Sequence, residues 1–214
     1  MNTYIKALSF LALTGATQQA MAVPVDFDFS GNFTNDNDIV LLDFTVATDS
    51  TVTIFSSSWD DGGLDPILAI WNSSGGLEHE QDDGHKIGTT QSNGVDYDHG
   101  DWDSFYDIAL TAGDYTASIG MYNNFAVSSL LSDGFDHDGE PNFSASLYGC
   151  SNGIFCGVGQ DNRTSEWAFH ILNVDSASNR DEGTVPEPST IAILGLGLAG
   201  LGMQLRRGRK TTAK

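Results

Sequence analysis

Apolar and polar residues alternate along much of the chain between positions 25 and 175. A period of two is typical of β-strands with one buried and one exposed face. Turns rich in Gly, Asn and Asp separate these segments and favour changes of chain direction. The predicted strands are 25–30, 39–46, 50–57, 67–71, 77–81, 104–110, 115–121, 143–147 and 167–174.

This part of the sequence has no apolar stripe of helical period and length. The predicted fold is therefore all-β, a jelly-roll-like β-sandwich over residues 23–175. Segment 67–71 is almost wholly apolar, so we expect it to be covered on both faces. Segments 82–103 and 123–142 are predicted loops, and loops of that length are commonly functional. Residues 176–185 are predicted to form a polar linker.

The two ends of the chain depart from this pattern. Residues 1–22 combine a basic residue, a short apolar core and Ala20-Met21-Ala22, which predicts a signal peptide cut after Ala22. Near the other end, Pro186-Glu187-Pro188 precedes an uncharged stretch at 189–205. That stretch is just long enough for a transmembrane helix. The basic tail that follows, through Lys210, predicts a cytoplasmic location for this end.

The charge of the central region is strongly negative. All 29 acidic residues lie between Asp26 and Glu187, with only three basic residues among them, which gives a net charge of −26 for this region. Such a charge disfavours nucleic acid and anionic lipid as partners. It suits solubility, divalent cations, or both.

Two groups of carboxylates are candidate calcium sites, because Ca²⁺ prefers about six to eight oxygen ligands from flexible loops. The second group contains Asp136-His-Asp138-Gly139, which matches part of an EF-hand loop but lacks its bidentate Glu. The alternative is that both groups are solvated turn residues. The first group is Asp60, Asp61, Asp65, Asp82 and Asp83; the second is Asp133, Asp136, Asp138 and Glu140.

The cysteines and His170 are expected to stabilise the fold, and the spacing of the cysteines and histidines does not indicate a zinc site. Cys150 and Cys156 enclose five residues, and in an exported chain such a pair is expected to form a disulfide. Its stabilisation is expected to be modest because the closed loop is small. The histidines have no paired zinc spacing, and His170 is expected to pack within its strand.

The tryptophans are expected to divide between core and surface. Trp71 and Trp167 lie in apolar strands, whereas Trp59 and Trp102 lie in acidic turns. Exposed indoles offer flat apolar surface, so Trp59 and Trp102 are candidate sugar-stacking residues. The chain has no GxSxG nucleophile motif and no cysteine free for nucleophilic attack, so we expect no catalytic residues and no enzymatic activity.

The C-terminal stretch resembles the PEP-CTERM sorting signal of Gram-negative bacteria, which joins a PEP motif, a Gly-rich apolar helix and an Arg-rich tail. Here these are Pro186-Glu187-Pro188, residues 189–205 and the basic tail through Lys210. The resemblance implies export through the Sec translocon and transient anchoring in the inner membrane. It also implies cleavage near the PEP motif by an exosortase, after which the domain reaches the cell surface or the medium.

The central region resembles the bacterial pre-peptidase C-terminal domain, a β-sandwich appended to secreted proteases, at 31–44, 65–76, 81–84 and 110–116. This resemblance implies a fold and no chemistry. We therefore expect an exported cell-envelope or extracellular-matrix protein with a structural or adhesive role, in contact with exopolysaccharide. The alternatives are a calcium-dependent carbohydrate- or peptide-binding accessory module and a secreted hydrolase.

Overall fold

The computed structural model describes residues 23–151 and 153–180. The strands of the first half are β1 (Val25–Asn32), β2 (Val40–Val46), β3 (Ser50–Ser56), β4 (Pro66–Asn72), β5 (Leu77–Asp82), β6 (Gly88–Ser92) and β7 (Val95–His99). They are followed by β8 (Phe105–Leu110), β9 (Gly113–Met121), the 3₁₀ helix η1 (Leu131–Asp133), helix α1 (Phe143–Tyr148), β10 (Glu166–Val174) and β11 (Ser176–Asn179).

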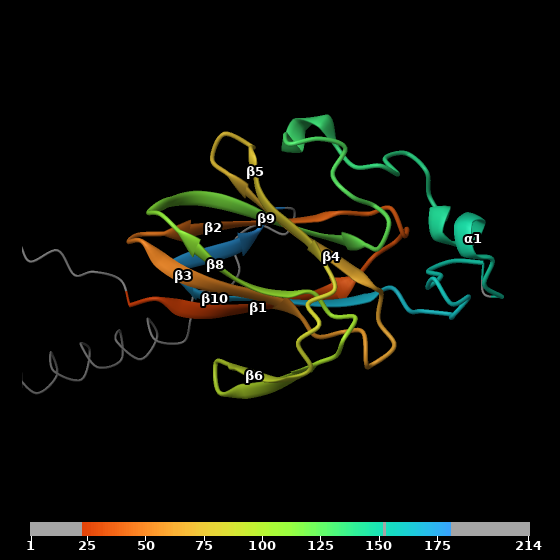
Figure 1. The fold of residues 1–214 in the computed structure, drawn as a ribbon, viewed down its shortest axis with the longest axis horizontal. Helices are drawn as coiled ribbons and strands as arrows, with labels where there is room; N and C mark the ends of the chain where they lie inside the picture. The colour runs from red at the N-terminus through yellow and green to blue at the C-terminus, as the bar shows by residue number, and fades with distance from the viewer. Residues whose placement is uncertain (1–22, 152, 181–214) are drawn as a thin grey trace, which may run out of the picture.

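Two antiparallel sheets face each other and form a β-sandwich, as predicted (Figure 1). Sheet A has the strand order β1-β10-β3-β8, and sheet B has the order β11-β2-β9-β4-β5. The last strands pair with the first ones: β10 lies between β1 and β3, and β11 pairs with β2. Both sheets therefore need residues from the two ends of the described chain.

The core lies between the sheets and is formed by the apolar side of the alternating strands. On β2, for example, Leu42, Phe44 and Val46 are buried. Strand β4 is buried on both faces, as its apolar run predicts. Its outer side is covered by the 122–142 loop, where the ring of Phe135 meets the ring of Trp71 edge-on at 6.2 Å.

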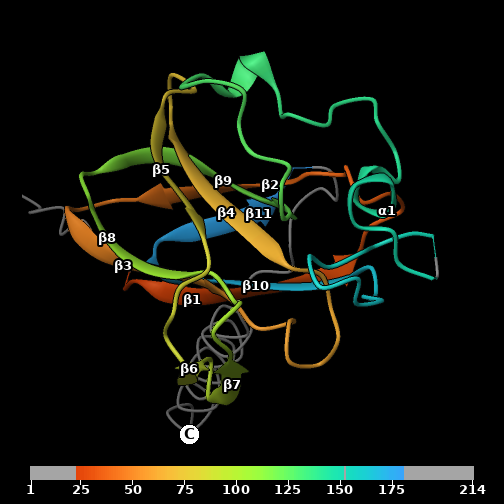
Figure 2. The ribbon, with the colours of Figure 1, turned by 45° about the vertical axis from the view of Figure 1, so that its right-hand side comes forward.

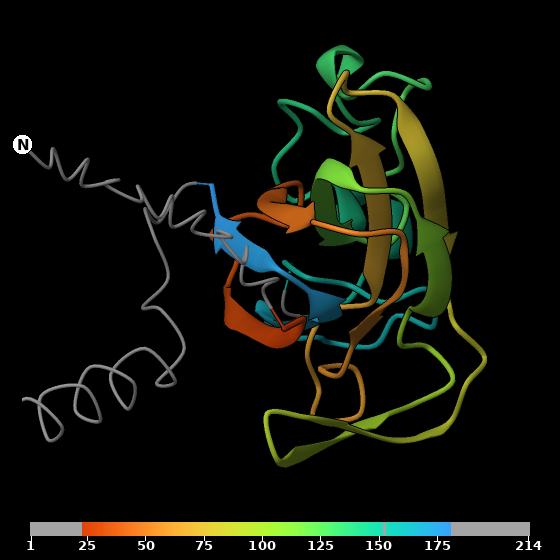
Figure 3. The same cartoon turned by 90° about the vertical axis from the view of Figure 1, so that its left-hand side faces the viewer.

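The prediction of a structureless loop at 82–103 is wrong, because this segment contains the hairpin β6–β7. Its turn is Asn93-Gly94, and both residues have positive φ values of 47° and 80°. A two-residue turn with positive φ at both positions matches the right-handed twist of the strands that it joins. Asn and Gly are the residues that adopt this conformation most readily. Figures 2 and 3 show the hairpin beyond sheet A, on the side away from sheet B; there Asn93 donates to Asp28 of β1 at 2.9 Å, and the ring of Tyr97 packs on His170 of β10.

The prediction of a strand at 143–147 is also wrong, because these residues belong to helix α1. The buried carboxylate of Asp36 accepts hydrogen bonds from the amides of Phe143 and Ser144, at 3.1 and 2.8 Å. These amides are among those that a helix leaves without an internal partner at its start. The helix is thus stabilised by a carboxylate about a hundred residues away in sequence.

The predicted disulfide between Cys150 and Cys156 is present, just after α1. The amide of Cys156 donates to the hydroxyl of Ser144 at 3.0 Å, and that hydroxyl donates to Asp36 at 2.5 Å. The disulfide loop, α1 and the turn that carries Asp36 therefore form one connected unit.

The predicted linker begins later than expected. Residues 176–179 form β11, which pairs with β2 and covers backbone groups that an edge strand would leave unpaired. Residues 181–185, the signal peptide, the PEP motif, the 189–205 stretch and the basic tail lie outside the described residues. Within the described ranges, no helix has the length and apolar character needed to cross a membrane.

Candidate functional site

Three of the predicted calcium ligands meet at one end of sheet B. Asp65 directly precedes β4, Asp82 ends the neighbouring strand β5, and Asp83 follows it. The register of the two strands places Ile67 opposite Asp82 and so brings the three carboxylates together. One carboxylate oxygen of each lies within 4.8 Å of the others. Asp65 is only 5 % exposed, and Asp82 and Asp83 are half-buried.

The three carboxylates of this cluster lack the hydrogen-bond donors that would normally stabilise buried negative charge. The Oδ1 atom of each carboxylate is buried and receives no hydrogen bond from the protein. Burial, and then the neighbouring carboxylates, raises the pKa of Asp65 to about 8 and that of Asp82 to about 7. Burial also raises the pKa of Asp83. Such a group retains protons near neutral pH or takes up a cation.

The other predicted ligands do not join this cluster. Asp60 and Asp61 are exposed, and Asp60 lies against Gly100. In the second predicted group, Asp138 accepts a hydrogen bond from the amide of Phe135 at 3.0 Å. Glu140 lies 3.1 Å from His137, and Asp133 accepts from the hydroxyl of Ser128 at 2.5 Å. These carboxylates serve local turns, and within the described ranges they form no three-residue metal group.

The two candidate sugar-stacking residues lie side by side near the carboxylate cluster. The ring centroids of Trp59 and Trp102 are 6.1 Å apart, and the rings are tilted by 49°. Trp102 is 50 % exposed. Arg163 covers one side of Trp59, with its guanidinium carbon 3.5 Å from the ring centroid. The pair therefore offers one open indole and not a flat two-ring platform.

Asp103 positions these two tryptophans, a role that no sequence motif indicates. It is 1 % exposed, and its Oδ1 accepts hydrogen bonds from the amides of Ser58 and Trp59 at 3.2 and 3.3 Å. Its Oδ2 accepts from the amide of Gly100 at 2.9 Å. The 57–65 loop and the 100–104 turn are thereby held together.

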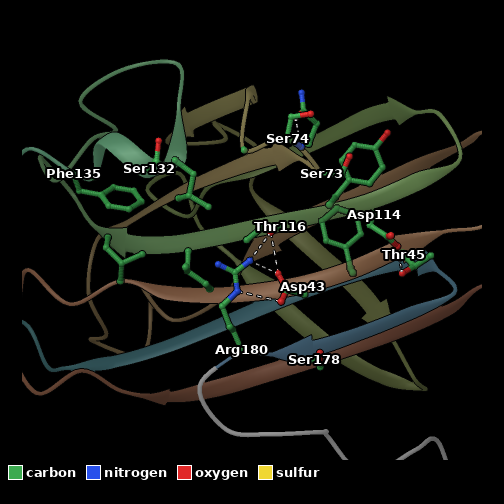
Figure 4. Close-up of a pocket in the computed structure, with 18 of the residues that line it drawn as sticks. Asp43, Thr45, Ser73, Ser74, Asp114, Thr116, Ser132, Phe135, Ser178 and Arg180 are labelled. Carbon is green, nitrogen blue, oxygen red and sulfur yellow. Dashed lines mark hydrogen bonds and ion pairs between the residues drawn. The ribbon is translucent and has the colours of Figure 1, made fainter.

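The outer face of sheet B carries a groove of about 1210 Å³ (Figure 4). At its centre, the guanidinium of Arg180 donates to both carboxylate oxygens of Asp43, at 3.1 and 2.5 Å, and to the hydroxyl of Thr116 at 2.9 Å. The contact with Arg180 lowers the pKa of Asp43 below its usual value. Further polar side chains that line the groove are Thr45, Ser73, Ser74, Asp114, Ser132, Ser176 and Ser178.

The groove was not predicted because its residues come from distant segments of the chain. Its floor comes from β2, β9 and β11, and one wall comes from the turn after β4. The other wall comes from the 131–138 segment, which carries Leu131 and Phe135. Only the strand order of sheet B places these segments next to one another.

A hydrogen-bonded relay lies on the outer face of sheet A. His170 on β10 contacts Asp28 on β1 through Nδ1 at 2.7 Å and Ser57 through Nε2 at 2.8 Å. His170 is 1 % exposed and packs between the rings of Phe55 and Tyr97. The order of groups is that of a Ser-His-Asp triad, which is recognised by geometry and not by sequence position. A pocket of about 290 Å³ adjoins Ser57.

The backbone around this serine has its donors already engaged. A triad needs N–H groups aimed at the oxyanion that forms during acyl transfer. The amide of Ser57 donates to the carbonyl of Ala168 at 3.4 Å, and the amides of Ser58 and Trp59 donate to Asp103. The geometry therefore favours a structural role for the relay, as expected for a packed His170.

Residues 184–207 match the family model of the PEP-CTERM protein-sorting motif. A comparison with curated proteins finds no match. The motif confirms the predicted sorting signal and supports an exported protein that an exosortase processes. The match does not reach the β-sandwich, so the resemblance to the pre-peptidase C-terminal domain stays a prediction.

Proposed function

We propose that this protein is a structural or adhesive component of the cell envelope or extracellular matrix, and that it holds neutral polysaccharide in the groove of sheet B. The observation that carries the proposal is the groove itself, which has a volume of about 1210 Å³, lies on the outer face of sheet B and is lined by both polar and apolar side chains. Delivery by the Sec translocon and an exosortase, with transient anchoring in the inner membrane, places this groove outside the cell. The protein has no catalytic activity in this proposal.

The chemistry of the lining suits sugar hydroxyls. Serine and threonine hydroxyls donate and accept hydrogen bonds, and carboxylates accept them. Phe135 adds an apolar wall against which a sugar ring can pack. The groove also contains Asp38, Asp114 and Asp138, in addition to Asp43, which Arg180 pairs. The remaining negative charge repels anionic chains, so a neutral polysaccharide fits best.

Blocking the groove tests this proposal. Ser176 is exposed on β11 and lines the groove, so Ser176→Trp places an indole where the chain would lie. We expect binding to neutral polysaccharides on a glycan array to fall by about tenfold or more, a loss of at least about 1.4 kcal/mol. Peptides on the same array test the alternative of a peptide-binding module.

The matched control is Ala109→Trp, which adds the same side chain to an exposed position on β8, the edge strand of the other sheet. It should bind glycans as the wild-type protein does. A blank array for the wild-type protein, or equal binding by the two tryptophan variants, would contradict the groove as the binding site.

A secreted hydrolase remains the second candidate, because the relay has the triad geometry. Since the neighbouring amides are engaged, we expect a fluorophosphonate probe to leave Ser57 unlabelled. Mass spectrometry of the treated protein checks this expectation. Labelling at Ser57 that disappears in His170→Gln would instead favour the hydrolase and contradict a purely adhesive role.

A further inference from the structure

Asp65, Asp82 and Asp83 form a group of ligand atoms that is unusual in this molecule. In residues 23–151 and 153–180, no other set of three His, Cys, Asp or Glu side chains brings its ligand atoms within 4.8 Å of one another. The group lies between the start of β4 and the end of β5, away from the groove of sheet B. It is therefore separate from the proposed polysaccharide site.

The second observation is the state of Asp65. Asp65 is only 5 % exposed, and its Oδ1 atom is buried and receives no hydrogen bond. The Oδ1 atoms of Asp82 and Asp83 are likewise buried and without a donor. Buried carboxylates are normally paired, hydrogen-bonded or bound to a metal. Three buried acceptors without a donor, on side chains that bring ligand atoms within 4.8 Å of one another, point to a missing positive charge.

The nearby cationic side chains are oriented toward other groups. Arg163 attracts Asp65 electrostatically, but its Nε donates to the carbonyl of Gly63 at 2.7 Å and its guanidinium packs on Trp59. His85 attracts Asp82 and Asp83 electrostatically, but its Nδ1 atom lies 3.2 Å from Asp101 and its side chain is exposed. The position between the three carboxylates therefore suits a small cation from solution.

The donor chemistry selects the cation. The group offers carboxylate oxygens and no nitrogen or sulfur, which disfavours zinc. Calcium accepts irregular sets of carboxylates, backbone carbonyls and water, whereas magnesium demands near-ideal octahedral geometry and loses its water reluctantly. We propose that Asp65, Asp82 and Asp83 bind one calcium ion, whose remaining ligands are backbone carbonyls and water.

Calcium at this position would stabilise the two ends of segment 83–104, which contains hairpin β6–β7. The amide of Gly84 donates to the carbonyl of Asp103 at 2.7 Å. A Cβ atom at Gly84 would lie 2.5 Å from the amide nitrogen of Phe105, so the chain approaches too closely for any other residue. Asp103 in turn holds the amide of Trp59. The ion therefore secures the two loops that carry Trp59 and Trp102.

Calorimetry of the full-length protein tests the proposal. Protein stripped with EDTA is titrated with CaCl₂, and its Tm is recorded with and without the metal. We expect one saturable site with a dissociation constant no weaker than about 10⁻³ M, the range of extracellular calcium modules. Calcium should raise Tm, and an equal concentration of MgCl₂ should raise it less.

Three variants distinguish the proposed calcium ligands from acidic residues outside the cluster. Asp82→Asn should weaken calcium binding by about tenfold or more, because one charged ligand is lost. Asp65→Asn should raise Tm in EDTA, where it removes the cost of burying or protonating this carboxylate, and should lower the Tm gain that calcium gives. Asp136→Asn, from the acidic group that the structure leaves dispersed, should bind calcium as the wild-type protein does.

The proposal would be overturned if adding calcium to the wild-type protein produced neither heat of binding nor a shift in Tm. So would wild-type binding by both Asp65→Asn and Asp82→Asn. Equal responses to calcium and magnesium would overturn the assignment to calcium. Because none of these measurements involves a glycan, they succeed or fail independently of the proposed polysaccharide groove.

Discussion

Asp61 and Asp65 are four residues apart in one acidic turn, yet their environments differ completely. Asp61 is exposed, whereas Asp65 is buried with two other carboxylates. The sequence predicts both as candidate ligands because it shows only the residue type. The difference arises from the pairing of β4 with β5, which brings Asp82 beside Asp65. Strand register is thus the information that the local sequence lacks.

The carboxylate cluster makes stability depend on pH. In the folded, metal-free protein, burial raises the pKa of Asp65 to about 8 and that of Asp82 to about 7, from the ordinary carboxyl value of 3.8. The folded state therefore binds protons that the unfolded chain has already released. The stability that these groups contribute is present at low pH and is lost as the pH rises through their folded-state pKa values.

We accordingly expect the Tm of the protein in EDTA to fall between about pH 5 and about pH 8. The fall should be smaller in Asp65→Asn, which cannot titrate at this position. Saturating calcium should also reduce the fall, because the metal replaces the protons. Thermal melts across this pH range check the sign, and a Tm that rises over the range in EDTA would contradict it.

At the scale of elements, most strands are predictable, because alternation reports burial on one face. The elements that were missed depend on other signals. Hairpin β6–β7 is mostly polar: β6 has no apolar alternation, and β7 has only the short one of Val95 and Tyr97, although Asn93-Gly94 marks the turn. Strand β11 has the sequence SASN and owes its conformation to the free edge of β2. Where the local sequence pattern is weak, pairing with a neighbouring strand therefore determines whether a segment forms a strand.

Helix α1 is the clearest case of long-range control, and it gives a prediction at this scale. Asp36→Ala removes the acceptor for the amides of Phe143 and Ser144, and for the hydroxyl of Ser144. Because these donors are buried, we expect a loss of about 2–4 kcal/mol in the free energy of unfolding. Urea denaturation monitored by fluorescence measures this loss.

Asp61→Ala provides the control, since Asp61 is exposed in another acidic turn. It should change the free energy of unfolding by less than about 0.5 kcal/mol. If the two variants are equally stable, the hydrogen bonds of Asp36 do not hold α1 in place.

At the scale of the whole molecule, the candidate sites lie on different parts of the β-sandwich. The groove covers the outer face of sheet B, the relay lies on the outer face of sheet A, and the carboxylate cluster lies at the end of β4 and β5. The sequence predicts the sandwich and part of the carboxylate cluster. It does not predict the groove or the relay, because each joins residues from strands that only the sheet order brings together.

The placement of β10 has a consequence for how the chain matures. This strand, at residues 166–174, lies between β1 and β3, so sheet A cannot be completed until almost the whole β-sandwich has been synthesised. The sorting motif begins only ten residues after β10 ends, at position 184. In a nascent chain that lacks β10, β1 and β3 have no strand between them and sheet A is incomplete. The sandwich can therefore complete sheet A only shortly before the sorting motif is synthesised.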